Sequence, residues 1–268
     1  MNKLLRTAVY GFAVGDALGV PYEFKERDTF CCKDMISGGT WGQLAGTWSD
    51  DTSLVLATCD SIRECNGINL EDMMHRFKMW YYDFEYTARH DVFDCGGTTY
   101  RAIRRYKEGT PFLSCGEKSN LSNGNGSLMR ILPLAFTDAD SATIAYVSSL
   151  THANQTSINC CFKYVMSIHH VVRFKNLSAP DKGVLNRTRG EVKSTGYVVD
   201  SYEAAKWCAG TSHGYSEAVL KAVNLGGDTD TIAALTGALA ALQWGYDSIP
   251  KGWIDKLANK ELIERCLF

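Results

Sequence analysis

The sequence predicts an all-α fold that forms a single compact domain over residues 1–268. Apolar residues recur three or four positions apart through most of the chain, which is the spacing of one face of a helix. Few stretches alternate strictly enough between apolar and polar residues to form strands. No flexible linker or internal repeat divides the chain, so we expect one helical core.

Helical spacing gives the order of the expected elements. It occurs in residues 2–15, 52–64, 69–85, 96–107, 138–151, 154–173, 200–209, 214–224 and 230–244. In the last of these segments the spaced apolar residues are Ile232, Leu235, Leu239 and Leu242. This pattern predicts a helix that packs into the core.

Three stretches between the expected helices lack this spacing. Residues 25–48 and 109–127 are rich in Gly, Ser, Asn and Thr, which predicts long loops. Loops of this length in a compact domain are often functional. Residues 174–196 are polar and basic, and we expect them to form a solvated excursion between two helices.

Composition excludes several classes of protein. A net charge of -2 and a pI near 6.3 give no electrostatic case for binding nucleic acid or an anionic membrane. No apolar run reaches the roughly 18 residues of a membrane span, and Asp16 interrupts the apolar N-terminal stretch that imitates a signal peptide. The 10 cysteines form no C-x-x-C pair. We therefore expect a cytoplasmic protein with reduced thiols. Its expected state is a monomer, although no sequence pattern bears on the oligomeric state.

Carboxylates stand in front of two expected helices. The sequence "WSDDTSLVLA" contains Ser49, Asp50 and Asp51, and "GGDTDTIAAL" contains Asp228, Asp230 and Thr231. One such Asp is usually a helix cap, but each cap needs only one side chain. Carboxylate and hydroxyl oxygens without His or Cys are ligands for Mg²⁺ or Mn²⁺, and the EF-hand alternative lacks its Glu at the twelfth position. If the two helix starts meet, they predict a metal site, because repulsion between the carboxylates would require cations.

Two further motifs leave alternatives open. Pro21 ends the first expected helix, so Glu23 in "GDALGVPYEF" falls on a loop. There it is either a solvated side chain or, beside a metal site, a general acid or base. The segment "SNGNGSLMRILPLA" is either an ordinary turn or a loop whose backbone N–H groups receive a phosphate.

Taken in order, seven segments resemble the ADP-ribosylglycohydrolases. They are "GDALGVPYEF", "WSDDTSLVLA", "GGTTYRAI", "GNGSLMRILPLA", "THANQTS", "GYVVDSYEAAKW" and "AVNLGGDTDTIAALTGALAAL". The resemblance runs from about residue 8 to residue 252. It implies an all-α fold with two divalent metal ions, Mg²⁺ or Mn²⁺, at the floor of a cleft.

The resemblance also implies roles for particular residues. The metal ligands would be Ser49, Asp50, Asp51, Asp228, Asp230 and Thr231, with Asp230 between the two ions. Glu23 would act in catalysis or as a ligand, and Asp94 would face the ribose unless it caps the helix that follows it. The positions implied for substrate binding are Gly97, Gly124, Asn125, Gly126, Ser127, His152 and Tyr197. Of these, the Gly-rich loop would receive the diphosphate, and Tyr197 would stack on the adenine.

The implied reaction is hydrolysis of the bond between ADP-ribose and a protein side chain, most readily arginine. The partner would be an ADP-ribosylated protein or a free ADP-ribose derivative. The chain has Ser49 where the family more often has Thr, and "THANQ" lacks the proline that usually follows the His.

Two other functions are compatible with parts of the sequence. One is a catalytically inactive relative that binds ADP-ribose or is structural, which loss of the acidic residues would favour, although all are present. The other is a metal phosphohydrolase with paired His-Asp ligands, for which the only adjacent pair of histidines is His169 and His170.

Overall fold

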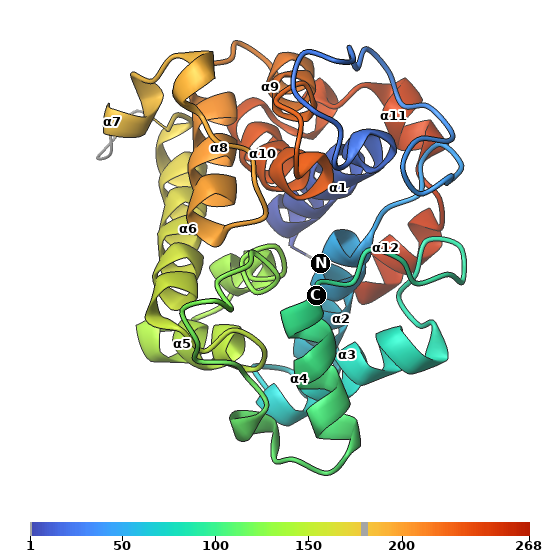
Figure 1. Ribbon diagram of the computed structural model, residues 1–268, viewed down its shortest axis with the longest axis vertical. Coiled ribbons are helices and arrows are strands. Elements are labelled where there is room, and N and C mark those ends of the chain that lie inside the picture. The colour runs from blue at the N-terminus through green and yellow to red at the C-terminus, as the bar shows by residue number, and fades with distance from the viewer. Residues whose placement is uncertain (1, 178–181) are drawn as a thin grey trace.

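The computed structural model describes residues 2–177 and 182–268, and it confirms an all-helical single domain (Figure 1). The α-helices of the described residues are α1 (Lys3–Gly19), α2 (Asp50–Cys65), α3 (Leu70–Asp83), α4 (Gly97–Lys107), α5 (Ser141–Ser149), α6 (Gln155–Phe174), α7 (Lys182–Leu185), α8 (Val198–Gly210), α9 (Tyr215–Val223), α10 (Thr229–Trp244), α11 (Lys251–Lys256) and α12 (Lys260–Cys266). These residues form isolated β-bridges but no strand.

Helices α1 and α10 lie side by side at the centre of the fold, with α6 and α8 on one flank and α2, α3 and α4 below them in the view of Figure 1. Every residue of α10 from Thr229 to Leu242 is buried, because α10 also contacts α2, α6, α8 and α9. Beyond its polar first turn, the buried residues of this helix are apolar or small except for Thr236, as expected for a central helix.

Glycines allow α1 and α10 to touch backbone to backbone. Gly11, Gly15 and Gly19 follow one another at four-residue intervals along the side of α1 that faces α10. A Cβ atom on Gly15 would lie 2.1 Å from the carbonyl oxygen of Ala233, and one on Gly19 would lie 2.3 Å from Cα of Asp230. The helices run antiparallel, so the C-terminal end of α1 is fixed against the N-terminal end of α10.

The structure has a helix within each segment of predicted helical spacing, but the boundaries differ. Helix α1 continues to Gly19 instead of ending at residue 15, because its last turn is buried against the α10 backbone. The sequence did not predict α11, α12 or the short 3₁₀ helix Leu132–Phe136.

The two long loops lie where predicted, but the polar 174–196 stretch contains α7 and a 3₁₀ turn at Arg189–Glu191. Residues 178–181 of this stretch lie outside the described residues. Among the described residues, no helix combines the length and apolar character that crossing a membrane requires.

The contact between α1 and α10 gives a prediction about stability. Gly15→Ala should lower the free energy of unfolding by about 1–3 kcal/mol, because the new Cβ overlaps the α10 backbone. The melting temperature, measured by circular dichroism, should fall by about 2–4 °C per kcal/mol.

Gly252→Ala is the matched control, because Gly252 is helical and nothing lies near its Cβ position. Alanine there should be neutral or stabilising by up to about 1 kcal/mol, since alanine favours helices. An unchanged or higher melting temperature for Gly15→Ala would contradict the close contact.

Candidate metal centre and active site

Acidic residues from distant parts of the sequence meet where α1 ends and where α2 and α10 begin. Asp16, Asp51 and Asp230 are fully buried, and each offers a carboxylate oxygen within 4.8 Å of the others. Glu23, Asp94 and Asp230 form a second group with the same spacing. Asp230 belongs to both groups, so the acidic segments near residues 50 and 229 converge as the sequence predicts.

Asp16 fixes the start of α2 against α1. Its Oδ1 accepts a hydrogen bond from the Ser49 N–H at 2.9 Å. Its Oδ2 accepts bonds from the Thr52 N–H at 3.0 Å and from the Thr52 hydroxyl at 2.6 Å. Asp16 was not predicted as a site residue, although a carboxylate between Gly15 and Gly19 on an otherwise apolar helix indicates a specific role.

Other carboxylate oxygens in the cluster have no hydrogen-bond donor. Among the described residues, Asp51 Oδ1 and both carboxylate oxygens of Asp230 are buried and have no hydrogen-bond partner. A buried charge without a partner costs several kcal/mol, so such atoms are normally paired or bound to a metal. Every candidate metal ligand in the cluster is a carboxylate or hydroxyl oxygen. The cluster therefore fits a hard divalent cation such as Mg²⁺ or Mn²⁺.

Burial and mutual repulsion raise the pKa values of these carboxyl groups. Burial is the main cause for Asp16, whose pKa rises to about 6, and for Glu23, whose pKa rises to about 7 although a bond from Trp41 opposes the shift. Burial and the neighbouring carboxylates raise the pKa values of Asp51 and Asp230 well above the usual range. The cluster therefore favours bound positive charge, as protons or as metal ions.

Glu23 and Asp94 lie on loops at the outer side of the cluster. Glu23 follows the 3₁₀ turn that contains Pro21, as predicted, and its carboxylate accepts a hydrogen bond from the indole N–H of Trp41. Asp94 has a φ of 53°, a left-handed conformation that is uncommon for residues other than glycine. Gly96 is the N-cap of α4, so Asp94 does not cap that helix and the capping alternative is wrong.

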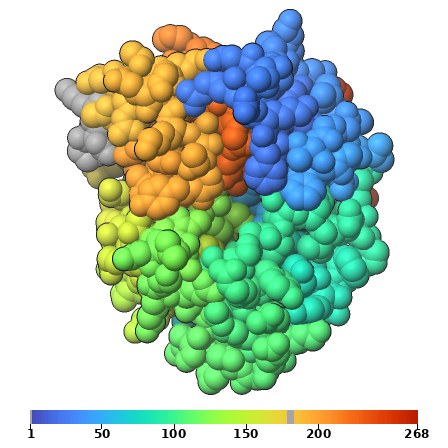
Figure 2. All heavy atoms as spheres, in the orientation of Figure 1, coloured from blue at the N-terminus to red at the C-terminus, as the bar shows by residue number. Residues whose placement is uncertain are grey.

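A cavity of about 240 Å³ opens above these carboxylates. Its lining residues are Glu23, Phe24, Asp50, Asp94, Gly96, Gly97, Thr98, Thr99, Gly124, Asn125, Gly126, Met129, His152, Gly196, Asp228 and Thr231. They come from blue, green and orange parts of the chain, which meet on the face of the molecule in Figure 2. The carboxylates of Glu23, Asp50, Asp94 and Asp228 thus share one cavity with the Gly-rich loop, while Asp16, Asp51 and Asp230 do not line it.

The Gly-rich loop is tied to the start of α10. The Asn125 side-chain amide donates to Asp228 Oδ2 at 2.6 Å and to the Ser201 hydroxyl at 2.9 Å. A Cβ atom on Gly126 would lie 2.6 Å from Thr99 Oγ1, so a larger residue here would displace its neighbours. The loop therefore presents its backbone close to the carboxylates.

A buried cation stands behind the same loop. Arg130 is fully buried, lies 4.6 Å over the Phe77 ring, and donates to the Thr151 hydroxyl at 2.8 Å. That hydroxyl lies 2.8 Å from Nδ1 of His152, which lines the cavity. Burial and the charge of Arg130 lower the pKa of His152 to about 3, so at neutral pH the imidazole is uncharged.

A family model described as ADP-ribosylglycohydrolase matches residues 2–267. The chain belongs to the ADP-ribosylglycohydrolase family. It is 30% identical to the ADP-ribosylarginine hydrolase Tri1 of Serratia proteamaculans, over 96% of this chain and 75% of that protein. It is 29% identical to the ADP-ribosyl-[dinitrogen reductase] glycohydrolase of Rhodospirillum rubrum, over 96% of this chain and 90% of the relative.

A solved structure titled "ADP-ribosylglycohydrolase-related protein complex" has the same fold. It superposes with a TM-score of 0.83 at 28% identity and covers 98% of this chain and 95% of the other. Fold and sequence therefore agree that this chain is an ADP-ribosylglycohydrolase family hydrolase.

Two of the predicted substrate-binding residues do not line this cavity. Ser127 is fully buried behind the Gly-rich loop, where its hydroxyl accepts a hydrogen bond from Ser148 at 2.9 Å. Tyr197 is 45% exposed, and its backbone forms a β-bridge with Gly124 at the edge of the loop. Gly97, Gly124, Asn125, Gly126 and His152 do line the cavity.

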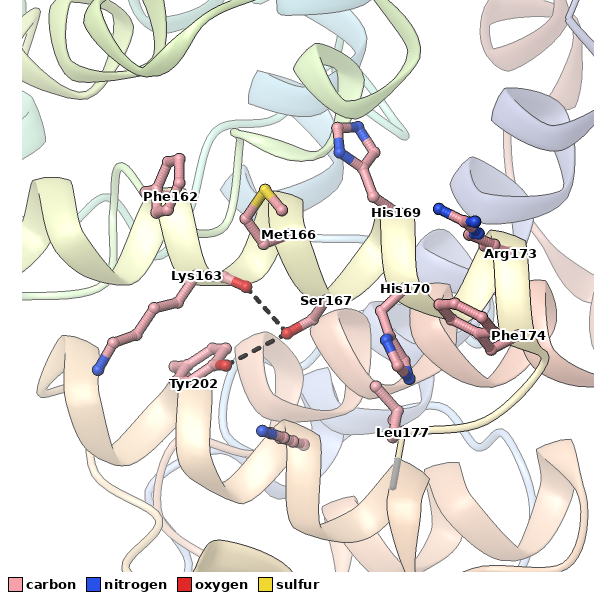
Figure 3. Close-up of a pocket in the computed structure, with 11 residues that line it drawn as sticks. Phe162, Lys163, Met166, Ser167, His169, His170, Arg173, Phe174, Leu177 and Tyr202 are labelled. Carbon is pink, nitrogen blue, oxygen red and sulfur yellow. Dashed lines mark hydrogen bonds between the residues drawn. The ribbon is translucent and has the colours of Figure 1, made fainter. Parts of the chain in front are cut away.

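A larger hollow of about 530 Å³ lies elsewhere, between α6 and α8 (Figure 3). His169 and His170 line it, together with apolar and cationic side chains, but its lining among the described residues includes no carboxylate. His169 Nε2 lies 3.0 Å from the Ala135 carbonyl oxygen, and His170 packs against Phe174. The histidine pair lacks acidic partners here, which argues against a His-Asp phosphohydrolase and leaves the acidic cavity as the candidate site.

Divalent cations should stabilise this protein when it has been freed of metal. Mn²⁺ at about 100 times its Kd should add about 2.7 kcal/mol, a rise in melting temperature of roughly 5–10 °C. Asp230→Asn should lose most of this rise, because Asp230 is shared by both acidic groups. Without metal, Asp230→Asn should be at least as stable as the unmodified protein, since it loses a buried carboxylate whose oxygens have no hydrogen-bond partner in the described part of the chain.

Asp60→Asn provides the control in the same scanning fluorimetry measurement. Asp60 is buried but pairs with Arg63 and Arg76, away from the cluster. The variant should melt at a lower temperature and keep the rise caused by Mn²⁺. A full rise in Asp230→Asn would show that the cation binds elsewhere.

Proposed function

We propose that this protein hydrolyses the glycosidic bond between ADP-ribose and a protein side chain, most readily arginine, and so reverses mono-ADP-ribosylation. The observation that carries the proposal is the buried Asp230, which is shared by two acidic groups. One of these groups also contains Glu23 and Asp94, which line a glycine-lined cavity. The similarity to an ADP-ribosylarginine hydrolase supports arginine as the acceptor.

The proposed metal centre uses the oxygen ligands at the starts of α2 and α10. These ligands are Ser49, Asp50, Asp51, Asp228, Asp230 and Thr231, of which all but the half-buried Asp228 are buried. Two bound Mg²⁺ or Mn²⁺ ions would orient the ribose hydroxyls and lower the pKa of water at the site. The unpartnered oxygens of Asp51 and Asp230 support this assignment.

The proposed position of ADP-ribose follows from the two ends of the cavity. Gly124, Asn125 and Gly126 offer a turn whose backbone suits a diphosphate, and the buried charge of Arg130 behind it favours an anion. Tyr197, at the outer edge of this loop, would stack on the adenine. The ribose would then lie over the carboxylates.

Glu23 and Asp94 are the proposed proton-transfer groups. Cleavage of a glycosidic bond develops positive charge on the ribose, and nearby carboxylates stabilise that charge. Burial raises the pKa of Glu23 to about 7, and a group with a pKa near the working pH can both accept and donate a proton. The protonated guanidinium of ADP-ribosylated arginine leaves as a neutral guanidine, so it needs less acid assistance than a serine oxygen, which would leave as an alkoxide.

The test uses two peptides of one sequence that carry ADP-ribose on arginine or on serine. The protein with Mg²⁺ or Mn²⁺ should release ADP-ribose from the arginine-linked peptide, and EDTA should abolish the release. Glu23→Gln and Asp94→Asn should each lower kcat by at least about 100-fold, because each removes a proton-transfer group. Both variants should still bind free ADP-ribose in calorimetry.

Each other outcome has a distinct meaning. Cleavage that EDTA leaves unchanged would contradict the metal assignment, and cleavage of the serine-linked peptide alone would contradict the arginine assignment. Binding of ADP-ribose without cleavage of either peptide would identify an inactive ADP-ribose-binding relative.

A further inference from the structure

Three aromatic side chains border the candidate site on the side of Glu23 and Asp94. They are Phe24, Trp41 and Phe93, which we call the aromatic lip. The Phe24 and Trp41 ring centroids are 6.3 Å apart, and those of Trp41 and Phe93 are 5.6 Å apart. Phe24 lines the cavity and is 65% exposed. This exposure is high for a phenylalanine, a residue that is usually buried.

Specific contacts fix the lip in place. Trp41 donates its indole N–H to the Glu23 carboxylate, and the Thr40 hydroxyl donates to the Glu23 carbonyl oxygen at 2.5 Å. The Phe24 N–H donates to the Gly227 carbonyl oxygen at 2.8 Å, just before α10. With a φ of 62°, Phe24 adopts a backbone conformation that is rare for a bulky residue and is typical of functional sites.

The two loops that carry the lip are also bonded to each other. The Gln43 amide donates to Asp91 Oδ2 at 3.1 Å, and Arg89 Nε donates to the Thr47 hydroxyl at 2.9 Å. These bonds connect the 25–48 loop to the residues before α4, close in sequence to the contact between Trp41 and Phe93. The lip is therefore a built feature and not a chance contact of loose side chains.

The chemistry of the lip suits a cation. Within the described residues, no lysine or arginine lies over the ring of Phe24, Trp41 or Phe93, although such contacts occur at other rings of the chain. The faces of these rings carry partial negative charge, and arginine is the cation that most often packs on them. The nearby carboxylates of Glu23 and Asp94 add to the attraction.

We propose that the aromatic lip is the subsite for the acceptor side chain, and that it binds the guanidinium of an ADP-ribosylated arginine. This inference rests on the proposed function. When the diphosphate lies at the Gly-rich loop, the acceptor leaves the ribose on the opposite side, toward Phe24. A serine-linked acceptor has no charge to place on the rings, so the lip selects for arginine.

The test changes Phe24 and Phe93, because Trp41 also positions Glu23 and its loss would affect the chemical step. Phe24→Leu and Phe93→Leu keep apolar volume but remove the ring. Each substitution should raise KM for the arginine-linked peptide about two- to five-fold, because this change corresponds to the loss of one exposed cation–π contact. Free ADP-ribose lacks the acceptor, so its affinity in calorimetry should not change.

Phe162→Leu is the matched control, since Phe162 is 40% exposed on α6 and borders the other hollow (Figure 3). It should leave KM for the arginine-linked peptide unchanged. Unchanged KM in both lip variants, or a loss of ADP-ribose affinity equal to the rise in KM, would overturn the inference. Failure of the proposed function is distinct, because the unmodified protein would then cleave no arginine-linked peptide.

Discussion

The direct backbone contact between α1 and α10 is the constraint on which the site depends. Helices with ordinary side chains between them pack 8–10 Å apart, and the glycines of α1 remove those side chains on one face. As a result Asp16 near the end of α1 and Asp230 near the start of α10 share one small volume. The apolar remainder of α10 holds this arrangement, because it is buried against the surrounding helices.

The buried carboxylates of the acidic cluster repel one another and are unfavourable in the core of the protein. The starts of α2 and α10 bring positive partial charge to the carboxylates, while the end of α1 brings negative partial charge. These effects oppose each other, so the helix ends do not neutralise the cluster. Asp16 is held by Ser49 and Thr52, whereas the carboxylate oxygens of Asp230 have no hydrogen-bond partner among the described residues. The hydrogen-bonded carboxylate of Asp16 therefore lies next to the unpartnered carboxylate of Asp230.

The sequence predicted the helices of the core and the acidic segments of the site for separate reasons. Helical spacing identified α10, and surplus carboxylates identified the starts of α2 and α10, because both signals are local. Local patterns do not show which residues a side chain meets on another helix. The hydrogen bonds of Asp16 to Ser49 and Thr52 were therefore not predicted. Trp41 and Phe93 were missed because they lie in loops whose shape depends on contacts such as the bond between Gln43 and Asp91. Ser127 was assigned to the substrate from a motif, and a motif does not say which way a side chain points.

The hydrogen bond between Asn125 and Asp228 makes two parts of the site interdependent. Asn125 belongs to the loop that forms one wall of the cavity, and Asp228 belongs to the floor. A ligand that moves the amide of Asn125 changes the environment of the Asp228 carboxylate, and hence the affinity of that carboxylate for a cation. Thermodynamic reciprocity then requires the cation to change the affinity for the ligand by the same factor. Binding of a ligand at the wall and binding of a cation at the floor would therefore be coupled through one side-chain amide.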